Sequence, residues 1–442
     1  MKIAFRFSII YLCLFISFIS YSHDLPWLTA PYLQNVKPNG ITIMWEIREK
    51  KDIYINYSTD QALKKSKQAR STNSKHDSHI YKVELINLKP GTTYYYRLSH
   101  EDMHSYIRTF RTAPLSPQPF SFGVWSDSQG HNRGVYNIDI HEPTKSMMKH
   151  MADSGVDIAL TAGDLAENGG NYQDVRNYFL DRIAKYLGQS VPFFPAWGNH
   201  EPNRQDIIRK FADTPAKNRT GMDPGWGSYS FDYAGVHFIC IDFSTMKEDI
   251  KTWLEDDLKS SLSNNPRYTF LFIHIPPYCE LWIDGDKWLR SRLVPLLEQY
   301  GVDAVFSGHT HEYERGYKEH VHYIITGGGS WLDWEEPIVK DWEHMFVGGA
   351  KNLAEFRHGL INEYVRVDVE MDEWIGSMHA FQPNGDYIGV RDRFGSMLKD
   401  ANGDGLLTGQ ERIMPSNYLT GMPSDARKIG VNDPTKKKKN AE

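Results

Sequence analysis

The chain has 442 residues, a formal net charge of −6 at pH 7 and 13% aromatic residues. This length is too great for a single hydrophobic core and predicts two or three domains. The acidic balance argues against general nucleic-acid binding, which depends on cationic side chains that neutralise phosphates.

Residues 1–22 have the features of a secretory signal peptide. Lys2 and Arg6 precede an apolar run over residues 7–19, and Ser20-Tyr21-Ser22 offers small residues at a cleavage position. The run is short for a membrane span, and an uncleaved anchor is the alternative. Cleavage would remove the two cations and change the net charge to −8. We therefore expect a secreted or periplasmic protein with no membrane span after signal removal.

Two cysteines, Cys240 and Cys279, follow the signal segment. A disulfide between them is compatible with an oxidising compartment, and two free buried thiols are equally compatible with the sequence.

Residues 25–114 predict an N-terminal β-sandwich. Gly40–Trp45 and Ile53–Tyr57 alternate as half-buried antiparallel strands do, and Leu88-Lys89-Pro90-Gly91-Thr92 is a turn leading into a third apolar run. This corner resembles that of fibronectin type III domains, and a generic β-sandwich is the alternative. Such modules usually position or dimerise a neighbouring domain, so the sequence leaves open whether the chain forms a homodimer.

A Pro-rich linker at residues 111–119 separates this sandwich from a domain predicted over residues 119–385, where strands alternate with helices. That alternation predicts a layered α/β fold in which helices flank the sheets. The expected strands are 120–125, 158–161, 193–196, 237–241, 269–273, 304–306, 322–326, 364–370 and 374–381, and the expected helices are 143–153, 173–187 and 286–300.

Each of five predicted strands ends in a side chain that can bind a metal ion. One such side chain after a strand is usually a turn former or a helix cap, but five in succession favour a metal site. Glycines beside them suit tight turns that bring the backbone close to ions. Imidazole and carboxylate ligands together suit Fe, Mn or Zn better than Ca or Mg. The side chains are Asp127, Asp164, Asn199 with His200, His274, and the pair His309 and His311.

The run Gly163-Asp164, Gly198-Asn199-His200-Glu201, His274 and Gly308-His309-Thr310-His311-Glu312-Tyr313-Glu314-Arg315 resembles the calcineurin-like metallophosphoesterases. Among these, it resembles the purple acid phosphatases, which also carry a fibronectin-III-like domain ahead of the catalytic one. The resemblance covers roughly residues 25–370, and it implies that the second domain is a four-layer α/β fold in which helices flank a sandwich of two β-sheets.

The resemblance implies a site for two transition-metal ions. Asp164 would bridge the ions, Asp127 and His311 would complete the first, and Asn199, His274 and His309 would complete the second. His200 would face the substrate and assist the reaction there.

The implied activity is hydrolysis of a phosphorylated small molecule, most simply a phosphomonoester, by a metal-bound water or hydroxide. Alternatives are a phosphodiesterase acting on a nucleotide or lipid head group, and a catalytically impaired binding or adhesion protein.

The chain departs from the family pattern at three places. Glu167 stands where purple enzymes have a tyrosinate ligand, and Gln129 stands where relatives without that tyrosine have a histidine, so either residue is a candidate metal ligand. We expect no tyrosinate-to-iron colour. Leu281-Trp282-Ile283-Asp284 replaces a histidine pair, which makes the pocket less basic. Residues 331–336 either line the same mouth or form an exposed loop.

Residues 391–415 contain a pattern typical of a single EF-hand-like calcium loop, and an Asx- and Gly-rich turn is the alternative. Short helices are expected on both sides, near residues 392–399 and 408–414. Residues 416–442 form a polar, charged tail, which we expect to be solvated. The candidate calcium ligands are Asp400, Asn402, Asp404, the Leu406 carbonyl, Thr408 and Glu411.

Overall fold

The computed structural model describes residues 25, 27–73, 76–130, 141–201, 210–215, 227–242, 248–398 and 412–413. The predicted signal segment, all six predicted calcium ligands and the polar tail lie outside these residues. Within the described part of the chain, no helix is both long enough and apolar enough to cross a membrane.

The N-terminal region consists of two antiparallel sheets that share one core, with Ile43 and Trp45 from one sheet and Ile55 and Tyr96 from the other. Trp45 stacks on Tyr81 of the neighbouring strand at 5.1 Å between ring centroids. A β-sandwich is therefore present, whereas its fibronectin type III character stays a prediction. One sheet contains β1 (Trp27–Lys37), β2 (Gly40–Ile47), β6 (His79–Ile86) and β5 (Arg70–Asn73), and the other contains β4 (Lys65–Gln68), β3 (Tyr54–Ser58), β7 (Thr93–His100), β8 (Met103–His104) and β9 (Arg108–Arg111).

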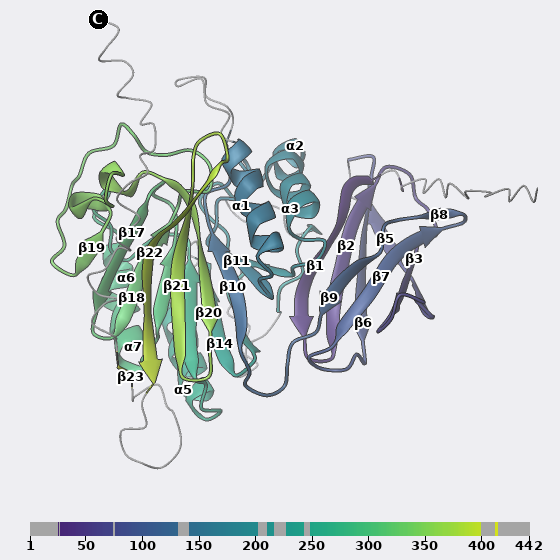
Figure 1. Ribbon diagram of the computed structural model, residues 1–442, viewed down its shortest axis with the longest axis horizontal. Coiled ribbons are helices and arrows are strands. Elements are labelled where there is room, and N and C mark those ends of the chain that lie inside the picture. Colours follow the sequence, from purple (N-terminus) through teal and green to yellow (C-terminus); the bar gives the residue numbers. More distant parts are fainter. Residues whose placement is uncertain are drawn as a thin grey trace, which may run out of the picture.

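The first of these sheets continues into the second region, because β1 pairs in parallel with β12. The resulting sheet has eleven strands (Figure 1). Its central strands β10, β11 and β12 are parallel, so their carboxyl ends meet at one edge. The strands beyond β1 are β12 (Phe193–Pro195), β11 (Ile158–Thr161), β10 (Phe120–Trp125), β20 (Asn362–Val369), β21 (Glu373–Phe381), β22 (Tyr387–Leu398) and β23 (Arg412–Ile413).

A separate seven-stranded sheet packs against the larger one through aromatic side chains. Phe122 of β10 makes edge contacts with Phe238, Phe270 and Phe306, with ring centroids 5.2, 5.1 and 6.2 Å away. Such contacts bury large apolar areas, so they stabilise the pair of sheets. In sheet order its strands are β13 (Tyr229–Tyr233), β14 (Val236–Ile241), β15 (Tyr268–Ile273), β16 (Ala304–Ser307), β18 (Val321–Thr326), β17 (Tyr313–Lys318) and β19 (Met345–Val347).

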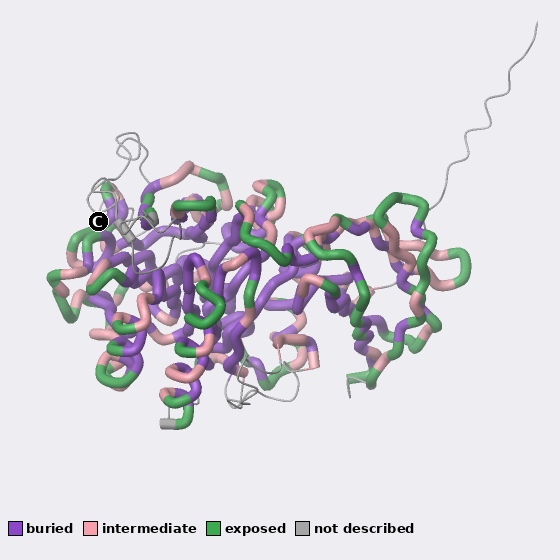
Figure 2. Tube along the Cα trace, turned by 90° about the horizontal axis from the view of Figure 1, so that it is seen from below, coloured by how far each residue is buried: buried purple, intermediate pink, exposed green. Residues whose placement is uncertain are grey.

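Helices cover the outer faces of both sheets. Met147 and Ile183 pack with residues of the larger sheet, and Trp253 and Leu297 pack with residues of the smaller one. Figure 2 shows that the buried segments run through the middle of both regions, with exposed turns around them. The helices are α1 (His141–Asp153), α2 (Tyr172–Asp174), the π-helix η1 (Val175–Leu180), α3 (Asp181–Tyr186), α5 (Glu248–Leu262), α6 (Lys287–Arg292), α7 (Val294–Gln299), η4 (Gly349–Lys351) and η5 (Arg357–Gly359).

The predicted alternation of strands and helices is confirmed within one to three residues at most boundaries. The prediction of a helix near residues 392–399 is wrong, because β22 extends to Leu398 and pairs with β21 along most of its length. Phe394 packs against Trp374 and His322 there, so tertiary contacts override the local pattern. The expected helix near residues 408–414 is also not found in its described part, because Arg412 and Ile413 are strand.

The two cysteines are both buried and free. The Cys240 thiol lies 3.8 Å from the Pro195 carbonyl oxygen, and the Cys279 thiol lies 3.1 Å from the Leu281 carbonyl oxygen. Cys240 and Cys279 are therefore free thiols and not partners in a disulfide.

Candidate metal centre

The predicted ligands come from the carboxyl ends of strands in both sheets. Asp127, Asp164 and Asn199 follow β10, β11 and β12 of the larger sheet. His274 follows β15 of the smaller sheet, and the pair at residues 309 and 311 follows β16. The site therefore lies where the two sheets meet.

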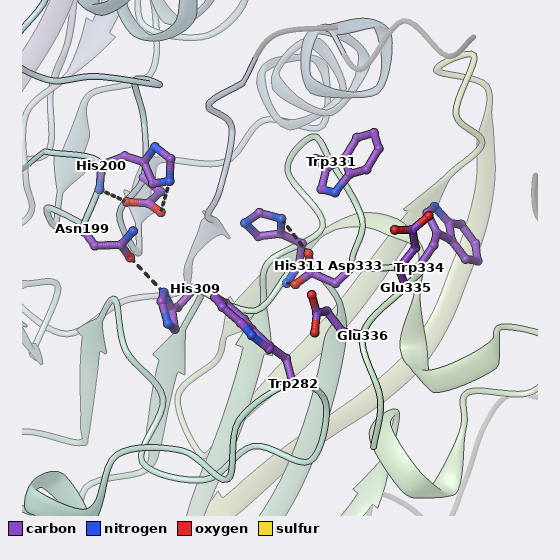
Figure 3. A pocket seen from close by; sticks show the side chains of 11 residues that line it. Asn199, His200, Trp282, His309, His311, Trp331, Asp333, Trp334, Glu335 and Glu336 are labelled. Atoms are coloured by element: carbon purple, nitrogen blue, oxygen red, sulfur yellow. Dashed lines mark hydrogen bonds and ion pairs between the residues drawn. The ribbon is translucent and has the colours of Figure 1, made fainter. Parts of the chain in front are cut away.

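Asn199 joins the histidines of the smaller sheet to the ligands of the larger one. Its Oδ1 lies 2.9 Å from His274 Nε2 and 2.9 Å from His309 Nδ1 (Figure 3). His274 Nδ1 is 2.9 Å from the Ala162 carbonyl oxygen, to which it donates. The lone pair of neutral His274 is then on Nε2 and points into the site, as a metal-ligating histidine requires.

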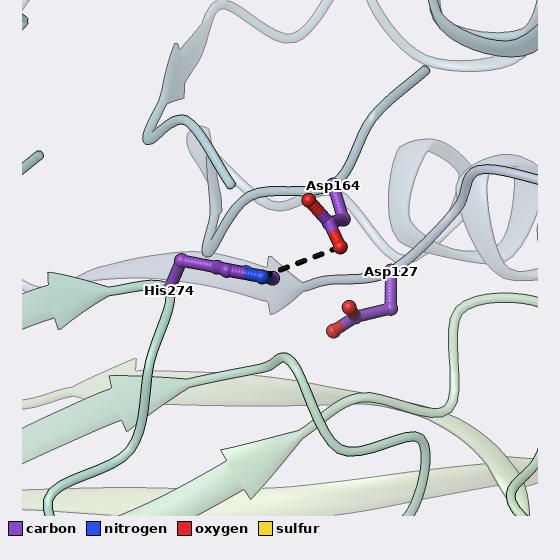
Figure 4. A group of neighbouring side chains, drawn as sticks. All are labelled: Asp127, Asp164 and His274. Carbon is purple, nitrogen blue, oxygen red and sulfur yellow. Dashed lines mark ion pairs between the residues drawn. The ribbon is translucent and has the colours of Figure 1, made fainter. Parts of the chain in front are cut away.

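The deepest part of the site contains Asp127, Asp164 and His274, whose candidate ligand atoms all lie within 4.8 Å of one another (Figure 4). Asp164 Oδ2 lies 3.3 Å from His274 Nε2. The carboxylate of Asp127 accepts the backbone N–H of His309 at 3.0 Å. All three side chains are at most 2% exposed, so a pair of carboxylates is buried beside one imidazole.

His311 completes the side of the site occupied by Asp127. Its Nε2 lies 3.6 Å from Asp127 Oδ1. Its other nitrogen, Nδ1, lies 3.3 Å from Asp333 Oδ1, and its backbone N–H donates to Asp333 Oδ2 at 2.9 Å. A carboxylate in this position fixes the orientation of the ring, so Asp333 is a positioning residue for His311.

Gln129 lies between Asp164 and His311. Its amide nitrogen can donate to the carbonyl oxygens of Asp127, at 3.2 Å, and Asp164, at 2.9 Å. In that orientation the amide oxygen is the atom 3.4 Å from both Asp164 Oδ2 and His311 Nε2. The side chain is 4% exposed and presents a ligand-type oxygen to the buried cluster.

Glu167 contacts the site through its backbone carbonyl group. Its carbonyl oxygen accepts from His200 Nδ1 at 2.8 Å, which directs His200 Nε2 toward the pocket. Its carboxylate is one of the charges that, after burial and Asp174, raise the pKa of Tyr178. That carboxylate is therefore near a tyrosine of the π-helix η1.

Two glycines allow the ligand loops to approach closely. A Cβ atom at Gly198 would lie 2.0 Å from Asp164 Oδ1, and one at Gly308 would lie 2.2 Å from Asp127 Oδ2. Any side chain at either position would displace a carboxylate of the cluster.

Glu201 is a buried supporting residue to which sequence reasoning assigned no role. Its carboxylate accepts the backbone N–H groups of Leu165, Ala166 and Gly198 at 2.8 to 2.9 Å. It thereby joins the loop after β11 to the loop after β12 and fixes Asp164 relative to Asn199. The feature of the sequence that could have indicated this role is the position of Glu201 at the end of the Gly198–Glu201 motif.

The charges of the site are unevenly distributed. Burial raises the pKa of Asp127 to about 6. Burial also opposes ionisation of Asp164, but the charges and hydrogen bonds of His274 and His200 outweigh it and lower the pKa to about 2. Burial likewise opposes protonation of His274, yet mainly Asp164 raises its pKa to about 9. His274 thus supplies positive charge between two buried carboxylates, a charge that a cation would replace.

The donor set fits a bound transition metal. Carboxylate oxygens, amide oxygens and imidazole nitrogens face one another in the site, an arrangement in which acceptor atoms need a cation between them. This mixture of oxygen and nitrogen donors is the chemistry of Fe, Mn or Zn sites.

The cluster opens into a pocket of about 360 Å³. His200 and the segment 331–336 line it, so that segment belongs to the mouth and the alternative of a remote exposed loop is wrong (Figure 3). The described lining residues are Asp164, Asn199, His200, Trp282, His309, His311, Trp331, Asp333, Trp334, Glu335 and Glu336.

Comparisons with known families identify both regions. Residues 120–313 match the family model of the calcineurin-like phosphoesterases, and residues 30–112 match that of the purple acid phosphatase N-terminal domain. The probable purple acid phosphatase 20 of Arabidopsis thaliana is 28% identical over 304 residues, which cover 64% of this chain and 68% of that protein. Purple acid phosphatase 21 of the same plant is 31% identical over 257 residues, 53% of each chain.

The similarity of fold to a solved structure covers a larger part of the chain. The structure of a purple acid phosphatase from yellow lupin (Lupinus luteus) seeds matches 83% of this chain and 74% of its own, with a TM-score of 0.63 and 16% identity. The chain spans between about half and two thirds of the length of the two Arabidopsis relatives. The chain therefore contains a calcineurin-like phosphoesterase domain, which indicates a phosphatase hydrolase, preceded by the N-terminal domain of the purple acid phosphatases.

Proposed function

We propose that the chain is a secreted phosphomonoesterase that uses two transition-metal ions. The observation that carries this proposal is the convergence of six ligand-type side chains from two sheets beside His200, at the floor of an open pocket. Secretion rests on the signal-like residues 1–22.

The side chains divide into two sets that share Asp164. Asp127 and His311 would hold the first ion with it, and Asn199, His274 and His309 would hold the second. Two bound ions would supply a clamp for the phosphate oxygens and lower the pKa of a water molecule.

His200 has the position of a general acid. Its Nδ1 donates to the Glu167 carbonyl oxygen, and its backbone N–H donates to Asp164 Oδ1 at 2.8 Å. The ring is therefore fixed with Nε2 toward the pocket, where it can donate a proton to the leaving oxygen or a hydrogen bond to the phosphate.

Hydrolysis of p-nitrophenyl phosphate and bis(p-nitrophenyl) phosphate with Mn, Zn and Fe tests the proposal. We expect faster release from the monoester, and His200→Ala should lower kcat by about 10²- to 10³-fold while metal content stays unchanged. Faster release from the diester would instead favour a phosphodiesterase. Release from neither ester in the metal-loaded protein would favour a binding protein.

Gln129, rather than Glu167, is the better candidate for an additional ligand of the first ion, because its amide oxygen faces Asp164 and His311. We expect Gln129→Ala to weaken binding of one of two metal equivalents by about 10- to 100-fold, measured by equilibrium dialysis with elemental analysis. Gln129→His should restore tight binding. Glu167→Gln is the matched control and should bind both metal equivalents. Loss of one equivalent in Glu167→Gln would instead identify Glu167, and not Gln129, as the additional ligand.

The sequence over residues 400–411 supports a structural calcium site, although these residues lie outside the described part of the chain. The flanking residues Leu398 and Arg412 are paired across β22 and β23, so a strand pair and not a helix pair borders the segment. We expect calcium binding with about 1:1 stoichiometry in calorimetry, and its loss in Asp400→Ala. The same calcium response in parent and variant would exclude this site.

A further inference from the structure

A second cluster of potential metal ligands contains none of the six candidate ligands described above. It consists of the Cys279 thiol and the carboxylates of Glu312 and Glu314, whose candidate ligand atoms all lie within 4.8 Å of one another. All three residues are 0% exposed. Cys279 lies in the loop after β15, Glu312 directly precedes β17, and Glu314 is part of β17. The cluster therefore joins that loop to the strand that follows the histidine pair.

The carboxylate of Glu312 is incompletely bonded. Its Oε1 lies 3.7 Å from Cys279 Sγ. Its Oε2 is buried and has no hydrogen-bond partner in the part of the chain that the structure describes. Such an oxygen has lost its water without replacement, which is destabilising. An atom of this kind beside a thiol and a second carboxylate points to a ligand that completes the site.

The surrounding protein compensates the neighbouring carboxylates but not this one. Lys351 Nζ pairs with Glu280 Oε1 at 3.0 Å. Glu314 accepts the backbone N–H groups of Glu280, at 3.0 Å, and Leu281, at 3.1 Å. Among the described residues, no lysine, arginine or histidine forms an ion pair with Glu312 or Glu314. A bound cation would supply the missing positive charge.

The separations suit one ion of the size of zinc. Zinc binds thiolate sulfur at about 2.3 Å and carboxylate oxygen at about 2.0 Å in tetrahedral sites, which places these two donor atoms about 3.5 Å apart. The corresponding distance from Cys279 Sγ to Glu312 Oε1 is 3.7 Å. Two further oxygens lie beside the sulfur and are candidates for a fourth ligand, the Leu281 carbonyl at 3.1 Å and the Thr310 hydroxyl at 3.4 Å. A thiolate together with carboxylates is a donor set of zinc rather than of calcium or magnesium.

We propose that Cys279, Glu312 and Glu314 bind a structural zinc ion, in addition to the proposed catalytic pair. On binding, the thiol proton passes to solvent and the sulfur becomes a ligand. The ion would tie the loop that carries Trp282, whose exposed indole lines the pocket, to the residue that follows His311 (Figure 3). It would therefore hold two walls of the pocket together without touching the substrate.

Loading the intact protein with Co²⁺ tests the proposal, because a thiolate bound to cobalt gives a charge-transfer band in the near ultraviolet that carboxylate and imidazole ligands do not give. We expect this band at one thiolate-bound ion per chain, and we expect Zn²⁺ to displace the cobalt. Cys279→Ser should abolish the band. Glu312→Gln should weaken cobalt binding against a competing chelator by at least about tenfold. Cys240→Ser changes the other buried free thiol, so it is the matched control and should keep the band.

Circular dichroism shows which variants are folded. Absence of the band in the folded, cobalt-loaded parent protein would overturn this site and leave the proposed catalytic ions untouched, because none of their six candidate ligands is a cysteine. Parental cobalt affinity in Glu312→Gln would also overturn it, as would a band that persists in Cys279→Ser and disappears in Cys240→Ser. The expected band in a protein that does not hydrolyse p-nitrophenyl phosphate would support this site and contradict the proposed function.

Discussion

Replacing Asp164 by alanine is expected to lower kcat by at least about 10³-fold and to reduce the bound metal below two equivalents. The carboxylate is 1% exposed, contacts His274 and His200, and is the side chain that both proposed ligand sets share. Its loss would remove negative charge from both halves of the site. Steady-state hydrolysis of p-nitrophenyl phosphate and elemental analysis of the same samples measure the two effects.

Asp303→Ala is the matched control, because it removes a buried aspartate just before β16, at the end of that strand opposite to His309 and His311. Asp303 accepts the backbone N–H of Thr269 at 2.7 Å and the indole N–H of Trp374 at 3.3 Å. Its replacement should lower stability but leave metal stoichiometry and kcat per folded molecule unchanged. Parental activity in the Asp164→Ala protein would contradict the enzymatic interpretation.

Asp392→Asn is expected to have the largest effect on stability, about 3 to 5 kcal/mol of unfolding free energy. Asp392 is fully buried on β22 and receives Arg315 Nε at 2.5 Å, Arg315 Nη2 at 3.1 Å and the Tyr313 hydroxyl at 2.8 Å. The neutral amide would leave the Arg315 guanidinium buried without its counter-charge. Urea unfolding monitored by tryptophan fluorescence measures the change.

Asp368→Asn removes the same charge from a more exposed pair and serves as the control. Asp368 bonds to Arg366 Nε at 2.9 Å, but its side chain is 42% exposed. A pair of this kind contributes about 0 to 1 kcal/mol. Equal effects of the two substitutions would show that the Arg315 pair is not a major stabilising contact.

The positions of the candidate ligands could be predicted because each follows a strand with a strong local pattern. The apolar runs before Asp127, Asp164 and His274 are continuous, as is typical of fully buried parallel strands. The residue at which each strand ends could therefore be located from the sequence. Parallel pairing then brings these ends to one edge of each sheet.

The supporting residues could not be predicted in this way. Asp333 contacts His311 although it lies 22 positions further along the chain, and Glu201 contacts Leu165 although it lies 36 positions further along. Contacts of this kind depend on how separate loops meet in space, and no period in the sequence encodes them. The exposed indole of Trp282 depends likewise on the pairing of its loop with residues 337–339.

In the C-terminal segment, a prediction from a local sequence pattern was wrong. Residues 392–398 were expected to be helical because a calcium loop of this type usually follows a helix. In the structure, Asp392 and Phe394 have partners on the smaller sheet, Arg315 and His322. These long-range contacts are available only to an extended strand, and they outweigh the local expectation.

Under the proposed metal assignment, the division of the candidate ligands between two sheets would couple metal occupancy to unfolding. Ions bound in this way, by Asp127, Asp164 and Asn199 on one sheet and by His274, His309 and His311 on the other, would have to be released before the sheets could separate. Ligands that bind only the folded state stabilise it by about 2.7 kcal/mol when their free concentration is 100 times the dissociation constant. A chelator would therefore act on this protein as a denaturant, and metal supply would set its lifetime against proteolysis as well as its catalytic rate.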